Sequence, residues 1–281
     1  MIRTVEPGTA SSPHARAGWQ ARLQLAFERR GTGTVLAERQ HRGPLVVQRP
    51  FYPEGEVCHI YVVHPPGGVV AGDELQLDVQ LRPGAHALLT TPAAGKFYRS
   101  EGALAQLRQN FTLCGGALEW LPQESIFYPG AAVLLSTELR LDAAARFLGW
   151  ELACLGLAAS DAPFRSGELR QHLQVWRDEQ LLLNERQHLD WEAICARWGL
   201  AGQAALGTLL ACPATARELE LARAAVDGHS AAACTLVDGL LICRAMGQNG
   251  AALRQAFVRI WSAVRPGLLG RAAHLPRVWA T

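Results

Sequence analysis

The most constraining feature of this chain is a series of short segments in which apolar and polar residues alternate. Residues 75–81 alternate without a break, and residues 133–141 and 169–176 behave similarly. This period of two is typical of half-buried β-strands. Residues 57–63 are nearly all apolar or β-prone and are expected to be buried on both faces. Turn residues recur every 8 to 14 positions or so, which predicts an all-β sandwich, barrel or solenoid from Trp19 to about residue 190.

The organisation changes after that segment. Residues 214–226 follow a proline, end at Asp227-Gly228 and predict a helix, and residues 251–264 predict a second one that ends at Pro266-Gly267. Residues 232–243 predict strands around a turn at Asp238-Gly239. No βαβ rhythm, no repeat of fixed period and no dividing linker are present, so residues 19–281 are expected to form one domain.

Composition excludes several classes of protein. The net charge of +2 and the scattered arginines give no support for nucleic-acid binding, and no apolar run reaches the roughly 20 residues of a membrane span. The first 18 residues lack the apolar segment of a signal peptide and are expected to be a disordered tail. Seven widely spaced cysteines without a C-x-x-C pair indicate reduced thiols in a cytoplasmic protein.

Lys96 is the only lysine of the chain, since 26 of the 27 basic residues are arginines. It follows Gly95, but a phosphate-binding loop needs a glycine five residues before that pair and a Ser or Thr after it. Thr90 and Phe97 occupy those positions, so the sequence does not predict nucleotide binding. A single lysine among arginines suggests a site for a compact ammonium, and chance in an arginine-biased composition is the alternative.

No preformed metal site is predicted. Cys58, His59 and His64 are the densest group of soft ligands, yet their spacing matches no standard metal motif. Glu151 and Glu185 stand out instead, because each lies inside an apolar run where an isolated charge costs several kcal/mol. The alternatives are that Glu151 points to solvent and that Glu185 pairs with Arg186 or another arginine.

The chain resembles the UreD family of urease accessory proteins, called UreH in some organisms. The resemblance rests on five segments that run in family order between residues 19 and 190: 43–54 (GPLVVQRPFYPE), 64–73 (HPPGGVVAGD), 90–100 (TTPAAGKFYRS), 118–126 (LEWLPQESI) and 149–151 (GWE). One departure is visible, because Gly156 is followed by Leu157 where many relatives have Gly-Arg. Any role of that arginine is therefore not carried over.

The resemblance implies a non-enzymatic chaperone of urease maturation with an irregular right-handed β-helix-like fold and a few helices in its C-terminal third. It implies association with UreF, which recruits the GTPase UreG, and docking on urease apoprotein. No cofactor is expected to be bound permanently, and nickel is expected only in transit through an internal passage. The residues that match the polar lining of that passage are Thr91, Glu151 and Glu185.

Two other functions remain open at this point. One is a β-rich hydrolase with a site near Lys96 and Tyr98, and the other is a purely structural interaction module without metal transit. The helices predicted at 214–226 and 251–264 are candidates for an apolar surface that receives UreF, with simple core packing as the alternative.

Overall fold

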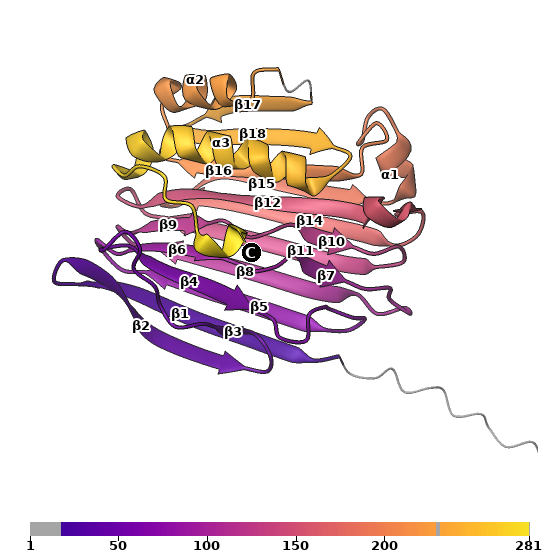
Figure 1. Ribbon diagram of the computed structural model, residues 1–281, viewed down its shortest axis with the longest axis horizontal. Helices are drawn as coiled ribbons and strands as arrows, with labels where there is room; N and C mark the ends of the chain where they lie inside the picture. The colour runs from indigo at the N-terminus through magenta and orange to yellow at the C-terminus, as the bar shows by residue number, and fades with distance from the viewer. Residues whose placement is uncertain (1–17, 229–230, 281) are drawn as a thin grey trace, which may run out of the picture.

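The computed structural model describes residues 18–228 and 231–280. The described chain is mainly β, and it forms two sheets with helices packed on the outside of one of them (Figure 1). The tail expected over residues 1–18 lies outside the described residues except for Gly18, which lies in close contact with the backbone of Gly72. None of the helices in the described part of the chain has the length and apolar character needed to cross a membrane.

The first sheet has seven strands. In spatial order these are β15 (Gln180–Leu189), β14 (Glu168–Arg177), β11 (Ala132–Leu141), β8 (Ala105–Leu113), β5 (Glu74–Leu81), β1 (Gln20–Arg30) and β2 (Gly33–Arg42). The five strands from β14 to β1 are parallel, and the two edge strands are antiparallel to their neighbours. The alternating segments at 75–81, 133–141 and 169–176 are therefore central strands of this sheet, as predicted.

The second sheet has eleven strands. Its main path is β17 (Ala232–Val237), β18 (Leu240–Gly247), β16 (Ala205–Cys212), β12 (Arg146–Leu157), β9 (Ala117–Trp120), β6 (His86–Thr90), β4 (Cys58–Val63) and β3 (Val46–Val47). The short strands β10 (Ser125–Phe127), β7 (Gly95–Phe97) and β13 (Ala162–Pro163) branch from this path. Its central strands β4, β6, β9 and β12 are parallel.

The chain crosses repeatedly from one sheet to the other. β5, β8 and β11 in the first sheet are each followed by a strand of the second sheet, namely β6, β9 and β12, and then by a short branch strand. From β5 to β14 in the first sheet and from β6 to β12 in the second, the strand numbers thus rise by three from one parallel neighbour to the next. In Figure 1 the colour accordingly advances across the molecule from indigo to orange, one coil of chain beside the next.

The helices lie in the last third of the chain. They are α1 (Trp191–Cys195), α2 (Ala216–Ala225) and α3 (Gly250–Leu269), with 3₁₀ turns at Ala158–Ser160 and Arg277–Ala280. α2 begins with a capping box of Thr215 and Glu218 rather than directly at Pro213. The predicted end of the second helix at Pro266 was wrong, because α3 continues through that proline to a left-handed Gly270.

Two apolar cores explain this layering. The first fills the space between the two sheets, and the second lies between the eleven-stranded sheet and helices α2 and α3. Leu253, Phe257, Ile260, Trp261 and Val264 of α3 are all buried in the second core. The apolar stripe of this helix is thus core packing and not an exposed surface for a partner.

Candidate functional site

The interior between the sheets is apolar except for a small set of inward-facing polar residues. On β12, for example, Phe147, Ala153 and Leu155 face this core, and Glu151 lies in phase with them. We call the following six residues the interior polar row: Gln109, Thr137 and Glu185 on the seven-stranded sheet, and Glu151, Thr208 and Arg244 on the eleven-stranded sheet.

Strand register places the members of this row beside one another. In the eleven-stranded sheet Glu151 pairs with Thr208 on β16, and Thr208 pairs with Arg244 on β18. In the seven-stranded sheet Gln109 pairs with Thr137, and the same line continues through Leu173 to Glu185. Because neighbouring strands are about 4.8 Å apart, paired members of each line lie side by side, and only Leu173 separates Thr137 from Glu185.

Glu151 is held by both neighbours on the facing sheet. The amide of Gln109 donates to its Oε1 at 2.9 Å and to the Thr137 hydroxyl oxygen at 3.0 Å, and the Thr137 hydroxyl donates to the same Oε1. Burial raises the pKa of Glu151 above its usual range, the hydrogen bonds oppose this change, and repulsion from Glu185 adds to it. The carboxyl group is therefore fixed in position and takes up a proton readily.

Glu185 lies at the edge of the seven-stranded sheet and does not pair with its neighbour Arg186. It forms an ion pair with Arg244 of the other sheet, and Gln187 donates to its second oxygen. The interpretation that Glu185 pairs with an arginine was right, but the partner is 59 residues away in the sequence.

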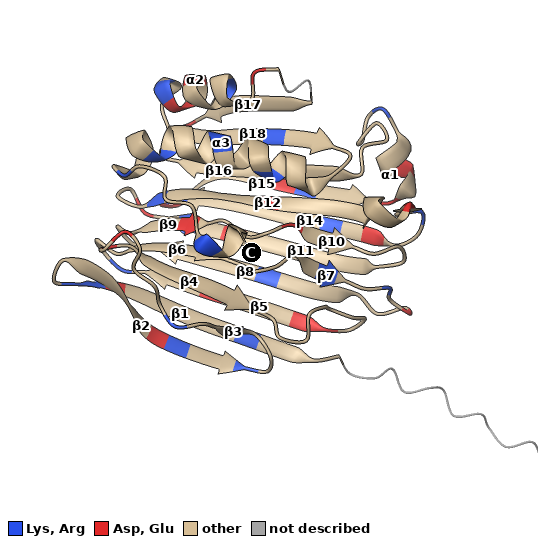
Figure 2. Ribbon diagram, in the orientation of Figure 1, with Lys and Arg blue, Asp and Glu red and all other residues tan. Residues whose placement is uncertain are grey.

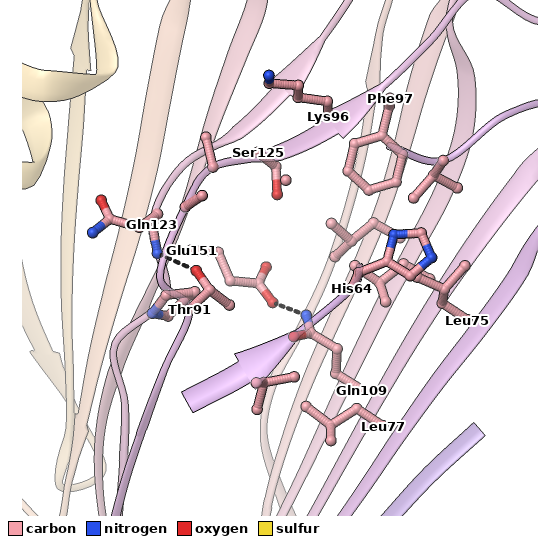
Figure 3. A pocket seen from close by; sticks show the side chains of 18 of the residues that line it. His64, Leu75, Leu77, Thr91, Lys96, Phe97, Gln109, Gln123, Ser125 and Glu151 are labelled. Atoms are coloured by element: carbon pink, nitrogen blue, oxygen red, sulfur yellow. Dashed lines mark hydrogen bonds between the residues drawn. The ribbon is translucent and has the colours of Figure 1, made fainter. Parts of the chain in front are cut away.

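Two cavities meet at Glu151. The larger has a volume of about 290 Å³, and Glu151, Gln109, Thr91 and His64 are among the residues that line it (Figure 3). The smaller, of about 20 Å³, is lined by Glu185 and Thr208 together with Glu151, Ala153 and Gln171, and these last three line both cavities. The first cavity has room for several water molecules and the second for about one, and the two adjoin at Glu151, Ala153 and Gln171.

Thr91 stands on the wall of the larger cavity, directly after β6. Its hydroxyl oxygen accepts a hydrogen bond of 2.9 Å from the backbone N–H of Gln123, as Figure 3 shows. His64 lines the same cavity. Burial lowers the pKa of His64 and so favours its neutral imidazole, although the nearby charge of Asp73 acts in the opposite direction. The structure thus brings Thr91 and Glu151 to one cavity and Glu151 and Glu185 to the next.

Lys96 and Tyr98 are placed differently. Both side chains are exposed, whereas Phe97 between them is buried. Lys96 lines the larger cavity, but its ammonium points away from the centre of the cavity (Figure 3). The structure gives Lys96 no ion pair within the described chain, and Tyr98 meets Tyr128 edge-to-face and covers Gly68. This arrangement does not bring a carboxylate to Lys96 as the hydrolase hypothesis requires.

The cluster of Cys58, His59 and His64 is divided between two regions. His59 is buried and bonds to Glu54 at 2.8 Å, on the side of the sheet that faces α3, while His64 lines the larger cavity. Across residues 18–228 and 231–280, no group of three or more His, Cys, Asp or Glu side chains is arranged to hold a metal ion.

Comparison with known proteins identifies the family. The model of the UreD urease accessory protein family matches residues 20–280. The chain belongs to this family. It is 46% identical over 276 residues to the urease accessory protein UreD of Enterobacter sp. (strain 638), with 98% of this chain and 99% of that protein covered. UreD of Klebsiella aerogenes is 45% identical over 271 residues (96% and 99% covered), and that of Pseudomonas putida (strain GB-1) is 46% identical over 273 residues (94% and 95%).

Membership confirms the resemblance seen in the sequence. The UreD family is one of accessory proteins in urease maturation, which is a chaperone-type function and not a catalytic one. It also implies interaction with urease and with other accessory proteins. The part played by Thr91, Glu151 and Glu185 is a separate question, which the family match does not answer.

Sequence reasoning missed Gln109, Thr137, Thr208 and Arg244. Gln109 and Thr137 lie on alternating strands: on β11, for example, Val133, Leu135, Leu139 and Leu141 share the inward face with Thr137. Thr208 and Arg244 instead interrupt the nearly continuous apolar runs of β16 and β18. An inward-phase polar residue was therefore the available signal. It identifies a buried polar group but not its partner, because the partner is set by strand pairing.

Proposed function

We propose that this protein is a scaffold and nickel conduit in urease maturation. Nickel would pass through the interior along Thr91, Glu151 and Glu185 while the protein is bound to UreF, the GTPase UreG and urease apoprotein. The observation that carries the proposal is the pair of cavities that share Glu151 and are lined by all three residues in turn.

The chemistry of the passage suits brief binding of a divalent cation. Its oxygens come from carboxylates, amides and hydroxyls, which bind Ni²⁺ less tightly than a tetrahedral set of thiolates and imidazoles. A passage must bind an ion strongly enough to admit it and weakly enough to release it. The raised pKa of Glu151 increases the competition between protons and a cation for its carboxylate, which weakens cation binding there.

The remaining parts of the proposal concern the whole chain. We infer that it works in the cytoplasm, holds no permanent cofactor and performs no catalysis of its own. Residues 19–281 would act as one domain, because strands from residues 46 to 247 share one sheet. The winding would be a right-handed β-helix, supported by the regular crossing between sheets and by the strong preference of parallel crossovers for that hand.

The test is co-expression with the other accessory proteins and urease. We expect Glu151→Gln combined with Glu185→Gln to leave partner binding intact in a pull-down but to yield urease with little nickel. Glu138→Gln combined with Glu168→Gln is the matched control, because these two carboxylates lie on the seven-stranded sheet, as Glu185 does, but pair with exposed arginines. Normal nickel content in the first variant would contradict the conduit and favour a purely structural interaction module.

A further inference from the structure

The ion pair of Glu185 and Arg244 joins the two sheets at one end of the interior polar row. Glu185 lies on the edge strand β15 and Arg244 on β18, and the pair forms across the gap between the sheets. The side chain of Arg244 is 48% exposed and that of Glu185 is 19% exposed. Arg244 therefore approaches the carboxylate from the solvent side, whereas the carboxylate itself lines the smaller cavity.

The smaller cavity offers oxygen atoms and very little space. Glu151, Glu185, Gln187 and Thr208 are among the residues that line it. The side-chain oxygen of Gln187 is buried and has no hydrogen-bond partner among the described residues, while its amide donates to Glu185. A buried amide oxygen without a donor is unusual, because such groups are nearly always satisfied. It is an available acceptor beside two carboxylates.

We propose that Arg244 is a displaceable counter-ion that competes with the transported cation for Glu185. This inference rests on the proposed passage. The guanidinium of Arg244 has donors only and neutralises Glu185, but Arg244 does not line the smaller cavity. The side chain of Arg244 is long and half exposed, so it can move into solvent. A divalent cation that reaches the small cavity takes its place on Glu185, and the return of Arg244 then releases the cation.

This arrangement explains how an acidic buried site avoids trapping its cargo. Without a counter-ion, Glu185 and Glu151 would repel each other in the empty protein and attract a divalent cation strongly. With Arg244 present, the cation must break a charge-assisted ion pair before it binds. Arg244 is thus a positioning residue that weakens binding at Glu185 by competition.

The test measures binding of Ni²⁺ alone to the purified full-length protein by equilibrium dialysis. We expect Arg244→Gln to bind Ni²⁺ about tenfold more tightly than the unaltered protein. The cation then no longer has to break the charged hydrogen bond between Arg244 and Glu185, and the free energy of such a bond corresponds to about a tenfold change in affinity. Arg244→Lys should stay near the original affinity. Arg186→Gln is the matched control, since Arg186 is the exposed neighbour of Glu185 and has no bond to it, and it should change affinity less than threefold or so.

The double variant E185Q/R244Q decides whether the gain acts through Glu185. We expect it to lose the tighter binding, and thermal unfolding shows in parallel that each variant is folded. Equal affinity of Arg244→Gln and the unaltered protein, or a gain that persists in the double variant, would overturn the counter-ion role. The conduit itself is judged separately, by the nickel content of urease made with Glu151 and Glu185 replaced, so the two ideas can fail independently.

Discussion

Replacement of Arg265 by methionine should destabilise this protein strongly. Arg265 lies on α3, is fully buried, and donates to both carboxylate oxygens of Glu119 on β9 and of Glu54. Its guanidinium also lies over the ring of Trp261 at 5.3 Å. The variant leaves two buried carboxylates without their arginine, and breaking a buried pair in this way costs about 3–5 kcal/mol.

The expected loss is a large fraction of the stability of a typical protein, which is about 5–15 kcal/mol. Urea unfolding followed by tryptophan fluorescence gives the free energy of unfolding for both proteins. Arg259→Met is the matched control, because Arg259 lies on the same helix, is exposed and donates only to the Ala225 carbonyl. That change should cost less than about 1 kcal/mol.

A triple variant separates lost charge pairing from lost packing. Replacing Glu54 and Glu119 by glutamine together with Arg265→Met should recover part of the lost stability, since no unpaired buried charge is left. The reasoning would be refuted if Arg265→Met cost less than about 1 kcal/mol, or if the triple variant were less stable than Arg265→Met alone.

Three further predictions concern other parts of the molecule. Burial would raise the pKa of Glu54, but His59 and Arg265 lower it to about 2. The ionised Glu54 should therefore stabilise the folded protein by about 3 kcal/mol above pH 4.5, and this contribution should disappear as the pH falls to 2. Acid unfolding of the unaltered protein and of Glu54→Gln measures it. Thr137→Val should lower nickel delivery to urease without loss of partner binding, because Glu151 loses a hydrogen bond that fixes it; unchanged delivery would contradict this role. Gly207→Ala should lower the free energy of unfolding by about 1–3 kcal/mol, because an added Cβ would lie 2.7 Å from the ring of Phe257 on α3. Urea unfolding measures this change, and a smaller loss would mean that α3 shifts to make room for the methyl group.

Much of the secondary structure was predictable from the sequence. The alternating segments became β5, β11 and β14 with bounds within one residue, and the hairpin around Asp238-Gly239 formed as expected, with both turn residues at positive φ. These features depend on local chemistry alone: alternation fixes which side chains face the core, and turn residues fix where a strand ends.

The pairing of strands was not predictable in the same way. Thr137 pairs with Gln109 on one side and with Leu173 on the other, at separations of about 30 residues. Alternation is equally compatible with many registers, and a shift of two residues would preserve every inward face. The sequence therefore indicated that Glu151 lies in an apolar run but left open whether it faces solvent or the interior.

The end of α3 illustrates another limit of local rules. A proline inside a helix removes one N–H donor and usually marks a boundary. Here Leu268 and Leu269 follow Pro266 and are buried in the second core, and the carbonyl of Pro266 accepts the cap bond from Gly270. The burial of these side chains outweighs the loss of one hydrogen bond close to the helix end.

Strand register also explains how the proposed passage can exist in a close-packed core. Apolar side chains on facing sheets fill the space between them, so a continuous opening requires that gaps on several strands line up. Glu151, Thr208 and Arg244 lie on one cross-strand line, and the facing line carries Gln109 and Thr137. Because each line follows strand pairing and not the chain, one or two inward polar residues per strand are enough to line these cavities, and most of each inward face stays apolar.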